Sequence, residues 1–301
     1  HYIFTLVSML NMISILMPVK NEEKFIESAI NSVLQQSYDY FELIIINDGS
    51  TDTTSEKVYS FDDKRIIFIE TEGVGKNKAF NLGFKASKGT YICYFAGDDL
   101  LVSESLEKRV NPITGREKEL LATVSKVKTI SEIKKFDGVI TPKLKDKGSM
   151  LGGTIMFTRP LADKIFPLPD ILPNEDKWTV EHIKSFAKVI HVPIVGIHYR
   201  IHQNNSSSRT NPFHLKTESM HKRFIVYALF LEKYRAELAQ KEILKLEALS
   251  AAETLRYNGN SLSILLMSGL SFSEKIRYFF HSRTLLYWIR IQLFSLLSGR
   301  S

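Results

Sequence analysis

The sequence predicts an α/β protein in which a mostly parallel sheet is covered by helices on both faces and followed by a C-terminal helical extension. Four uninterrupted apolar segments alternate with amphipathic segments in the first hundred residues, which is typical of parallel strands buried on both faces. Polar residues follow several of these segments, at the sheet edge where such folds bind ligands. After about residue 210, only a helical periodicity remains.

The elements of the first half follow from the period of the apolar residues. Continuous apolar runs predict strands at Ile13–Val19, Phe41–Ile46, Ile66–Ile69 and Tyr91–Phe95. Apolar residues at helical spacing predict helices at Glu22–Gln36, Thr53–Ser60 and Lys76–Ala86. This order of strands and helices predicts a parallel sheet that is covered on both faces.

The second half of the sequence is less regular. The lysine-rich segment Ser103–Gly148 shows no clear period, so it receives no assignment. Strands are expected at Gly152–Thr158, Val189–Val192 and Val195–Ile201, with a helix that ends near Ala187 and a polar run at Gln203–Thr210. Long helices are expected at Leu215–Tyr257 and Ser273–Leu297. We therefore expect one domain at residues 12–210 and a helical extension at residues 211–301.

The charge of the chain is concentrated in its C-terminal third. Residues from Pro212 onward contain 13 Lys and Arg against seven Asp and Glu, so they carry +6 of the net +7. No zinc-finger spacing or RNA-binding motif accompanies this charge, so a nucleic-acid partner is not expected. Aromatic and basic residues alternate in Ser273–Leu297, which favours a helix on a membrane surface. An ordinary packed helix, or a contact in a homodimer, is the alternative.

Carboxylates at strand ends are the main chemical signal. Asp98 and Asp99 follow an apolar strand directly, and adjacent carboxylates repel each other unless a cation lies between them and a ligand. Their oxygens suit Mg²⁺ or Mn²⁺ shared with a diphosphate. The alternative is that the pair caps the next helix. Asp48, in Asn-Asp-Gly-Ser, is equally compatible with a turn.

Several ordered blocks of the sequence resemble family 2 glycosyltransferases with the GT-A fold. They are Pro18-Val19-Lys20-Asn21-Glu22-Glu23, Phe41 to Asp52 with its Asn-Asp-Gly-Ser, Gly75 to Gly83, Gly97-Asp98-Asp99 and Glu175-Asp176. The resemblance extends from about Ile13 to Ser207. It implies a Rossmann-like nucleotide-binding sheet and transfer of a sugar from a nucleoside diphosphate sugar, which is expected to be a UDP-sugar.

The resemblance also implies a donor site at the strand ends. Pro18, Val19 and Glu22 would line the nucleotide pocket at the tip of the first strand. Asp48 would accept hydrogen bonds from the base or the ribose. Lys78 stands where the family usually has a basic residue near the nucleotide.

Metal binding and catalysis are implied in the same way. Asp98 and Asp99 match the metal-binding acidic motif, and His202 matches, more loosely, a position near the metal and the diphosphate. Asp176 matches the catalytic base. The first acidic position of the motif is Ala96 here, so weaker binding of Mn²⁺ or Mg²⁺ is expected.

The resemblance therefore implies an inverting, metal-dependent glycosyltransferase of bacterial surface polysaccharide or oligosaccharide synthesis. Its acceptor would be a glycan or a lipid-linked sugar, and it would work in the cytoplasm or on the inner face of the cell membrane. The alternatives are a non-catalytic sugar-nucleotide-binding or scaffold protein, which the alanine in the acidic motif would permit, and a nucleotidyltransferase of related fold.

Overall fold

The computed structural model of the 301-residue chain describes residues 11–202 and 212–298. These residues form two compact units, one of residues 11–170 and 174–202 and the other of residues 171–173 and 212–298. The predicted polar run Gln203–Thr210, and with it the expected boundary between 210 and 211, lies outside the described residues.

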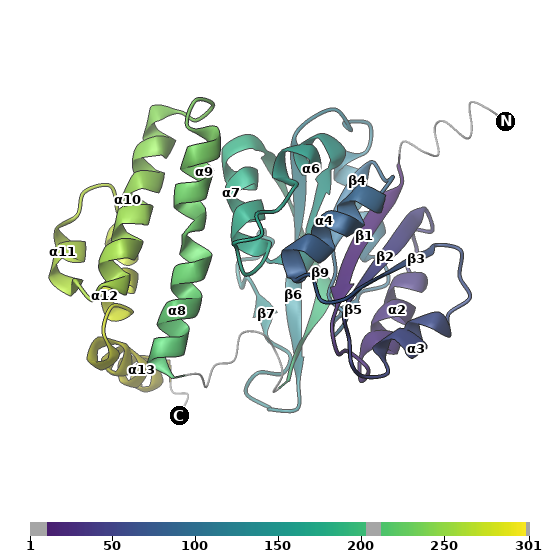
Figure 1. Ribbon diagram of the computed structural model, residues 1–301, viewed down its shortest axis with the longest axis horizontal. Helices are drawn as coiled ribbons and strands as arrows, with labels where there is room; N and C mark the ends of the chain where they lie inside the picture. The colour runs from purple at the N-terminus through teal and green to yellow at the C-terminus, as the bar shows by residue number, and fades with distance from the viewer. Residues whose placement is uncertain (1–10, 203–211, 299–301) are drawn as a thin grey trace. The chain divides into compact units, whose positions relative to one another are not determined.

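The first unit is built on one sheet, whose path is β3-β2-β1-β4-β8-β6-β9-β5 (Figure 1). Its first half is parallel, as predicted, with β1 between β2 and β4. The strands of this half are β1 (Ile13–Val19), β2 (Phe41–Asp48), β3 (Ile66–Thr71) and β4 (Tyr91–Tyr94). Because β1, β2 and β4 are buried along almost their whole length, continuous apolar runs were a sufficient signal for them.

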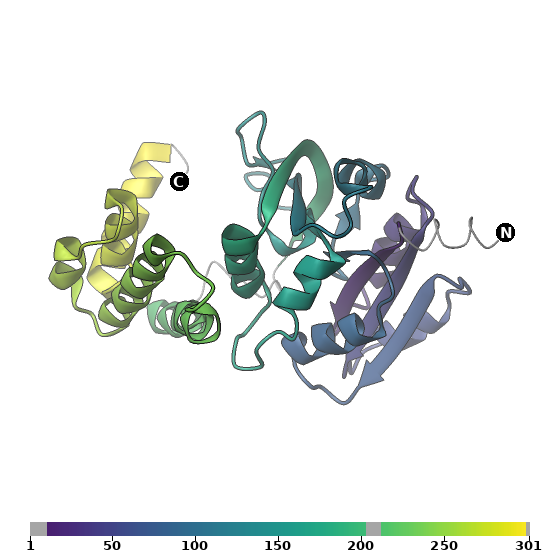
Figure 2. The same cartoon turned by 90° about the horizontal axis from the view of Figure 1, so that it is seen from above.

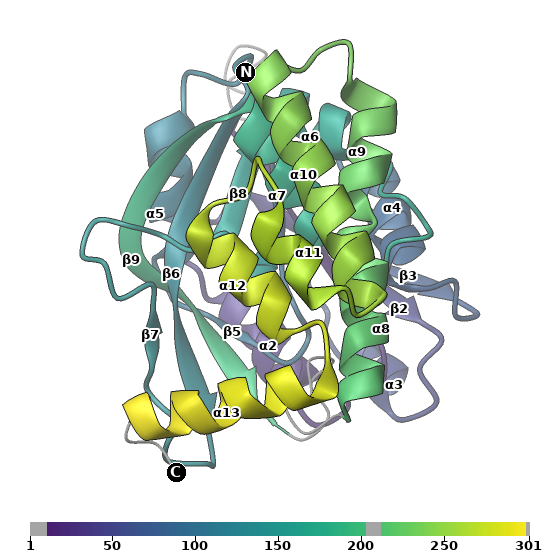
Figure 3. The ribbon, with the colours of Figure 1, turned by 90° about the vertical axis from the view of Figure 1, so that its left-hand side faces the viewer.

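The second half of the sheet is mixed. It consists of β5 (Leu100–Leu101), β6 (Leu121–Ser131), β8 (Ile155–Thr158) and β9 (Lys188–Ile201), with β7 (Ile140–Thr141) paired to β6. Strand β8 is antiparallel to β4 and β6, whereas β9 runs parallel to β6. The register of β6 and β9 shifts near Lys126, and β9 curves along its length (Figure 3).

Helices cover both faces of this sheet (Figure 2). They are α2 (Ile26–Leu34), α3 (Thr54–Tyr59), α4 (Lys76–Ala86), α5 (Ser105–Val110), α6 (Arg159–Ile165) and α7 (Asp176–Phe186). Buried residues of α2 and α5 join the core formed by β1 and β4. Helix α4 packs on β1 and β2 through a face that includes Ala79 and Phe80, and it is seen lying across these strands in Figure 1.

The second unit is helical, as predicted, but its helices are shorter. The expected helix Leu215–Tyr257 is divided into α8 (Phe213–Phe224), α9 (Val226–Tyr234) and α10 (Gln240–Tyr257), and the expected helix Ser273–Leu297 into α12 (Phe272–Phe280) and α13 (Thr284–Ser298). The short α11 (Ser261–Leu266) lies between the two groups in sequence (Figure 3). A capping box of Ser271 and Glu274 begins α12. Within the described residues, no helix is long and apolar enough to span a bilayer.

Two local predictions in the first unit were wrong, and one segment had received no assignment. Residues Gly152–Thr154 form a 3₁₀ turn, η2, before β8 rather than its first part. The two strands expected at Val189–Val192 and Val195–Ile201 are one strand, β9. The unassigned segment Ser103–Gly148 contains α5, the 3₁₀ turn η1 (Asn111–Ile113), β6 and β7. Strand β6 is partly exposed and irregularly paired, so its apolar residues do not keep a strict period of two.

Candidate functional site

The loops that follow β1, β2 and β4 lie at one edge of the sheet, because these strands are parallel neighbours. Pro18 and Val19 are the last residues of β1 and pair with Ile46 and Asn47 of β2. The candidate residues Glu22, Asp48, Asp98 and Asp99 all follow or end these strands. The topology therefore brings together residues that are up to 81 positions apart in the sequence.

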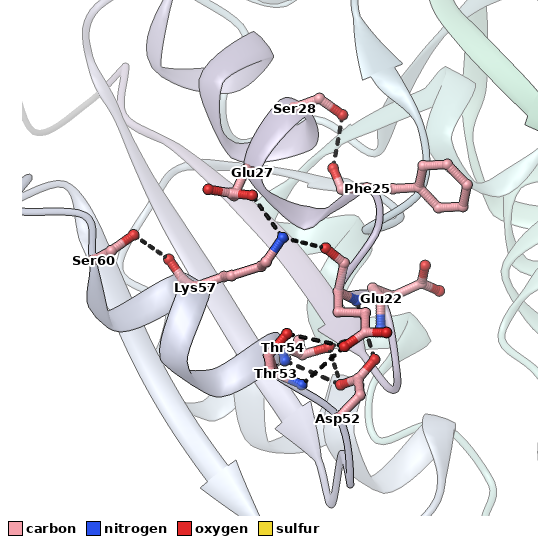
Figure 4. Close-up of polar contacts among 10 residues, drawn as sticks. Glu22, Phe25, Glu27, Ser28, Asp52, Thr53, Thr54, Lys57 and Ser60 are labelled. Atoms are coloured by element: carbon pink, nitrogen blue, oxygen red, sulfur yellow. Dashed lines mark hydrogen bonds and ion pairs between the residues drawn. The ribbon is translucent and has the colours of Figure 1, made fainter.

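Polar groups at the start of α3 hold the loop after β1 in place (Figure 4). The backbone N–H of Glu22 donates to Thr54 Oγ1 at 2.8 Å. The N–H of Glu23 donates to Asp52 Oδ2 at 3.2 Å, and Lys57 Nζ donates to the carbonyl oxygen of Glu23 at 2.8 Å. These bonds satisfy backbone groups that a turn would otherwise leave unpaired, so the position of Glu22 is well defined.

Glu22 lies against the acidic loop that follows β4. A Cβ atom at Gly97 would come within 2.8 Å of Val19 Cγ1 and 3.2 Å of Glu22 Cγ, so the glycine allows this close approach. Burial, and then the charges of Asp98 and Asp52, raise the pKa of Glu22 to about 8. The edge of the sheet is therefore a place where negative charge is costly and a cation is favourable.

Asp48 anchors the loop between β3 and α4. Its Oδ1 accepts hydrogen bonds from Val74 N at 2.6 Å, from Gly75 N at 3.1 Å and from Thr71 Oγ1 at 3.0 Å, and its Oδ2 accepts from Gly75 N at 3.1 Å. The residue is buried. The Asp48 carboxylate thus accepts from three groups of the protein and holds the loop before α4. Its Asn-Asp-Gly-Ser sequence indicated a turn but not this contact with a distant loop.

The acidic motif is organised by the end of β9. His202 Nε2 lies 3.0 Å from Asp98 Oδ2. Asp99 Oδ1 accepts a hydrogen bond from Arg200 N at 2.9 Å, and Arg200 Nε donates to the carbonyl oxygen of Asp98 at 2.8 Å. The Arg200 guanidinium also lies 4.7 Å from the centre of the Phe25 ring. Sequence reasoning selected His202 but missed Arg200, although alternate residues of a strand share a face.

The two aspartates differ in their surroundings. Asp99 is buried, and this burial, followed by the charge of Asp98, raises its pKa well above the ordinary range despite the bond from Arg200. Among the residues that the structure describes, no group of three or more His, Cys, Asp and Glu side chains is arranged to hold a metal ion. Asp98 and His202 form the closest oxygen and nitrogen pair of the predicted metal-binding set.

A second acidic centre lies at the start of α7. Asp176 is the first residue of this helix, and Glu175 precedes it as the N-cap. A Cβ atom at Gly152 would lie 3.0 Å from Asp176 Oδ1 and 3.1 Å from Glu175 Oε1, so η2 packs closely against both carboxylates. Asn174 Nδ2 donates to Asp176 Oδ2 at 3.3 Å.

Lys76, which sequence reasoning missed, lies beside this second centre. Its Nζ is 3.1 Å from Glu175 Oε2. Burial near the ammonium group opposes its charge, but the carboxylates of Glu175, Asp176 and Asp98 raise the pKa of Lys76. Because the Lys76 side chain is 49% exposed, burial opposes its charge only in part, and the neighbouring carboxylates determine that its pKa is raised. Lys78, the predicted nucleotide contact, is 3.6 Å from Asp170 Oδ2 on a more open surface.

Comparisons with known proteins agree with this architecture. Residues 14–147 match the family model "Glycosyl transferase family 2". An uncharacterized glycosyltransferase of Rickettsia bellii is 32% identical over 175 residues, which cover 54% of this chain and 25% of that protein. The Escherichia coli enzyme WfgD, a UDP-Glc:α-D-GlcNAc-diphosphoundecaprenol β-1,3-glucosyltransferase, is 36% identical over 101 residues, 33% of this chain and 40% of WfgD. The chain thus spans less than half the length of these relatives.

A solved structure extends the likeness beyond the matched segment. Staphylococcus aureus TarS, residues 1–349, in complex with UDP-GlcNAc superposes with a TM-score of 0.61 at 18% identity. The superposition covers 90% of this chain and 79% of that one. At this identity the likeness concerns the fold alone, and it confirms the predicted GT-A architecture with C-terminal helices.

Proposed function

Because residues 14–147 match the family model "Glycosyl transferase family 2", we propose that this chain transfers a sugar from a UDP-linked nucleoside diphosphate sugar to a hydroxyl group of an acceptor, with inversion at the anomeric carbon. One observation carries the proposal. The first unit contains two acidic centres, Asp98 with His202 and Asp176 with Glu175, and carboxylates of both raise the pKa of Lys76, against the effect of burial. One centre suits the leaving diphosphate and the other suits the acceptor.

The donor nucleotide would bind along the ends of β1 and β2. Pro18, Val19 and Glu22 would line this pocket, and Asp48 would receive hydrogen bonds from the base or the ribose while it holds the loop before α4. Lys78, on the first turn of α4, would contact the nucleotide from the more open side.

Asp98, Asp99 and His202 would hold a Mn²⁺ or Mg²⁺ ion. These residue types suit such an ion: an oxygen of Asp98 and the Nε2 nitrogen of His202 lie 3.0 Å apart, and a second carboxylate, that of Asp99, is next in sequence. When bound, the ion would neutralise negative charge on the departing diphosphate. The alanine at position 96 removes one carboxylate from this motif, so we expect the affinity for the ion to be modest.

Asp176 would act as the general base. A carboxylate at the first turn of a helix is a suitable acceptor for the proton of an attacking hydroxyl. A single base and an in-line displacement give inversion, because the acceptor attacks opposite to the leaving diphosphate. Glu175, which is buried and paired with Lys76, would support this base rather than exchange protons itself.

We further propose a glycan or lipid-linked acceptor in the synthesis of a surface polysaccharide, at the inner face of the cell membrane. The acceptor named for WfgD supports this class. Residues 12–210 would be the catalytic domain, and the basic helices of 211–301 would contact a membrane or a second copy of the chain. Exposed apolar side chains support such a contact; they include Leu262, Leu266, Phe272, Leu285 and Trp288.

The experiment that tests the proposal is calorimetric titration of UDP, GDP and CDP, each with and without Mn²⁺. We expect UDP to bind, and to bind more tightly with Mn²⁺. Asp176→Asn should keep UDP binding and lose transfer from UDP-sugars, whereas Asp99→Ala should weaken the effect of Mn²⁺ on binding. A folded protein that binds none of the three nucleotides would refute a transferase and leave the scaffold interpretation.

A further inference from the structure

The carboxylate of Glu175 is almost fully enclosed by protein. The residue is 4% exposed, and among the described residues Lys76 is the one basic side chain within ion-pair distance of it. Lys76 Nζ lies 3.1 Å from Oε2 and 3.3 Å from Oε1. A buried carboxylate without a cation would be strongly disfavoured, so this pair determines where Glu175 can lie.

The position of Glu175 determines that of the next residue. Glu175 is the N-cap of α7, and Asp176 is its first helical residue. A Cβ atom on Gly152 of η2 would lie 3.0 Å from Asp176 Oδ1 and 3.1 Å from Glu175 Oε1, so the glycine leaves space there for both carboxylates. Glu175 is buried and Asp176 half-buried, and the pair lies beside the first residue of α4 and the 3₁₀ turn before β8.

We propose that Lys76 is a positioning residue for sugar transfer: its ammonium group holds Glu175, and through it keeps the Asp176 carboxylate in place against Gly152. This inference rests on the proposed function of Asp176 as the base. Lys76 precedes Glu175 by 99 residues in the chain. The inference gives this first residue of α4 a role in the chemical step rather than in nucleotide binding.

The test compares Lys76→Met and Lys76→Arg with the wild type. Release of UDP from UDP-GlcNAc and UDP-glucose measures turnover with Mn²⁺, and calorimetry measures the Kd of UDP. We expect Lys76→Met to lower kcat about 30- to 100-fold, as for a misplaced catalytic group, with UDP affinity unchanged within about twofold. Lys76→Arg should restore most of kcat. Lys85→Met, which removes an exposed charge from the last turn of the same helix, should match the wild type.

A double variant separates positioning from folding. Glu175→Gln combined with Lys76→Met leaves no buried charge unpaired, so it should fold even where the single lysine variant does not. Since both residues act as one unit, its kcat should be no lower than that of Lys76→Met. Multiplicative losses in the double variant would contradict the inference.

Two further results would overturn it. They are a kcat for Lys76→Met within threefold of the wild type, or a loss of UDP affinity as large as the loss of kcat. The last result would make Lys76 a nucleotide ligand. A wild-type protein that neither binds UDP nor releases it from UDP-sugars would instead refute the proposed function, and the inference with it.

Discussion

Replacement of Asp48 by alanine should destabilise the first unit, because it removes the side chain that anchors the loop between β3 and α4. The Asp48 carboxylate accepts from two consecutive backbone N–H groups, Val74 at 2.6 Å and Gly75 at 3.1 Å, and from the Thr71 hydroxyl at 3.0 Å. Alanine would leave both backbone donors without this acceptor in a buried place. The loop that leads into Lys76, the first residue of α4, would then lose these hydrogen bonds to β2.

The size of the effect follows from these bonds. A hydrogen bond to a charged group contributes about 1.5–3 kcal/mol, and two backbone donors lose such a partner. Because part of the loop can turn toward water, we expect the free energy of unfolding to fall by about 3 kcal/mol, which is less than the upper limit for two such bonds. For a unit of this size, that corresponds to a fall in Tm of about 6–12 °C. Asp48→Asn, which keeps one acceptor oxygen, should lose about half as much.

Tryptophan fluorescence provides the assay. The chain has two tryptophans, of which Trp178 is buried in the first unit and Trp288 is exposed in the second. In a Trp288→Phe background, urea unfolding reports on the first unit alone. Asp62→Ala serves as the control, because Asp62 is exposed and its loss should change stability by less than about 0.5 kcal/mol. A loss below about 1 kcal/mol for Asp48→Ala, or equal stability of Asp48→Asn and the wild type, would refute the reasoning.

Three other outcomes test separate parts of the molecule. Gly152→Ala should lower kcat about tenfold with unchanged UDP affinity, since its Cβ would displace two carboxylate oxygens; full activity would contradict the close packing seen here. Arg256→Met should lower the free energy of unfolding by about 3 kcal/mol in urea, because the buried Glu253 carboxylate loses its guanidinium partner and keeps only His221 Nδ1, at 3.2 Å, among its side-chain partners in the described residues; an added Glu253→Leu should recover part of that loss. Although burial opposes it, bonds from Lys245 and the helix cap lower the pKa of Glu274 to about 2. Its stabilising effect is therefore complete above about pH 4.5 and disappears as the pH falls toward 2, which thermal unfolding of the wild type and Lys245→Met would show.

The parallel half of the sheet could be predicted from the sequence because its signals are local. Ile13–Val19, Phe41–Asp48 and Tyr91–Tyr94 are buried on both faces, so each appears as a continuous apolar run. The polar residues that follow them could be assigned to one edge because parallel neighbours share a direction. The residues that resemble family 2 glycosyltransferases occur at these same strand ends, so the sequence also predicted a donor site there.

The mixed half of the sheet could not be predicted in the same way. Strand β6 is partly exposed and changes register against β9 near Lys126, so its side chains follow no simple period. The break between α12 and α13 depends on packing within the helical unit, because apolar residues at helical spacing continue across it.

The sequence by itself thus determined the parallel half of the sheet, the helical character of the C-terminal region and the acidic residues that follow the strands. Only the tertiary structure decided which residues meet. Lys76 and Lys78 are two residues apart on one helix, yet Lys76 pairs with Glu175 and Lys78 lies near Asp170. Asp48 likewise meets the loop before α4 only in the folded chain. These choices depend on contacts between segments far apart in sequence, and a local pattern carries no information about them.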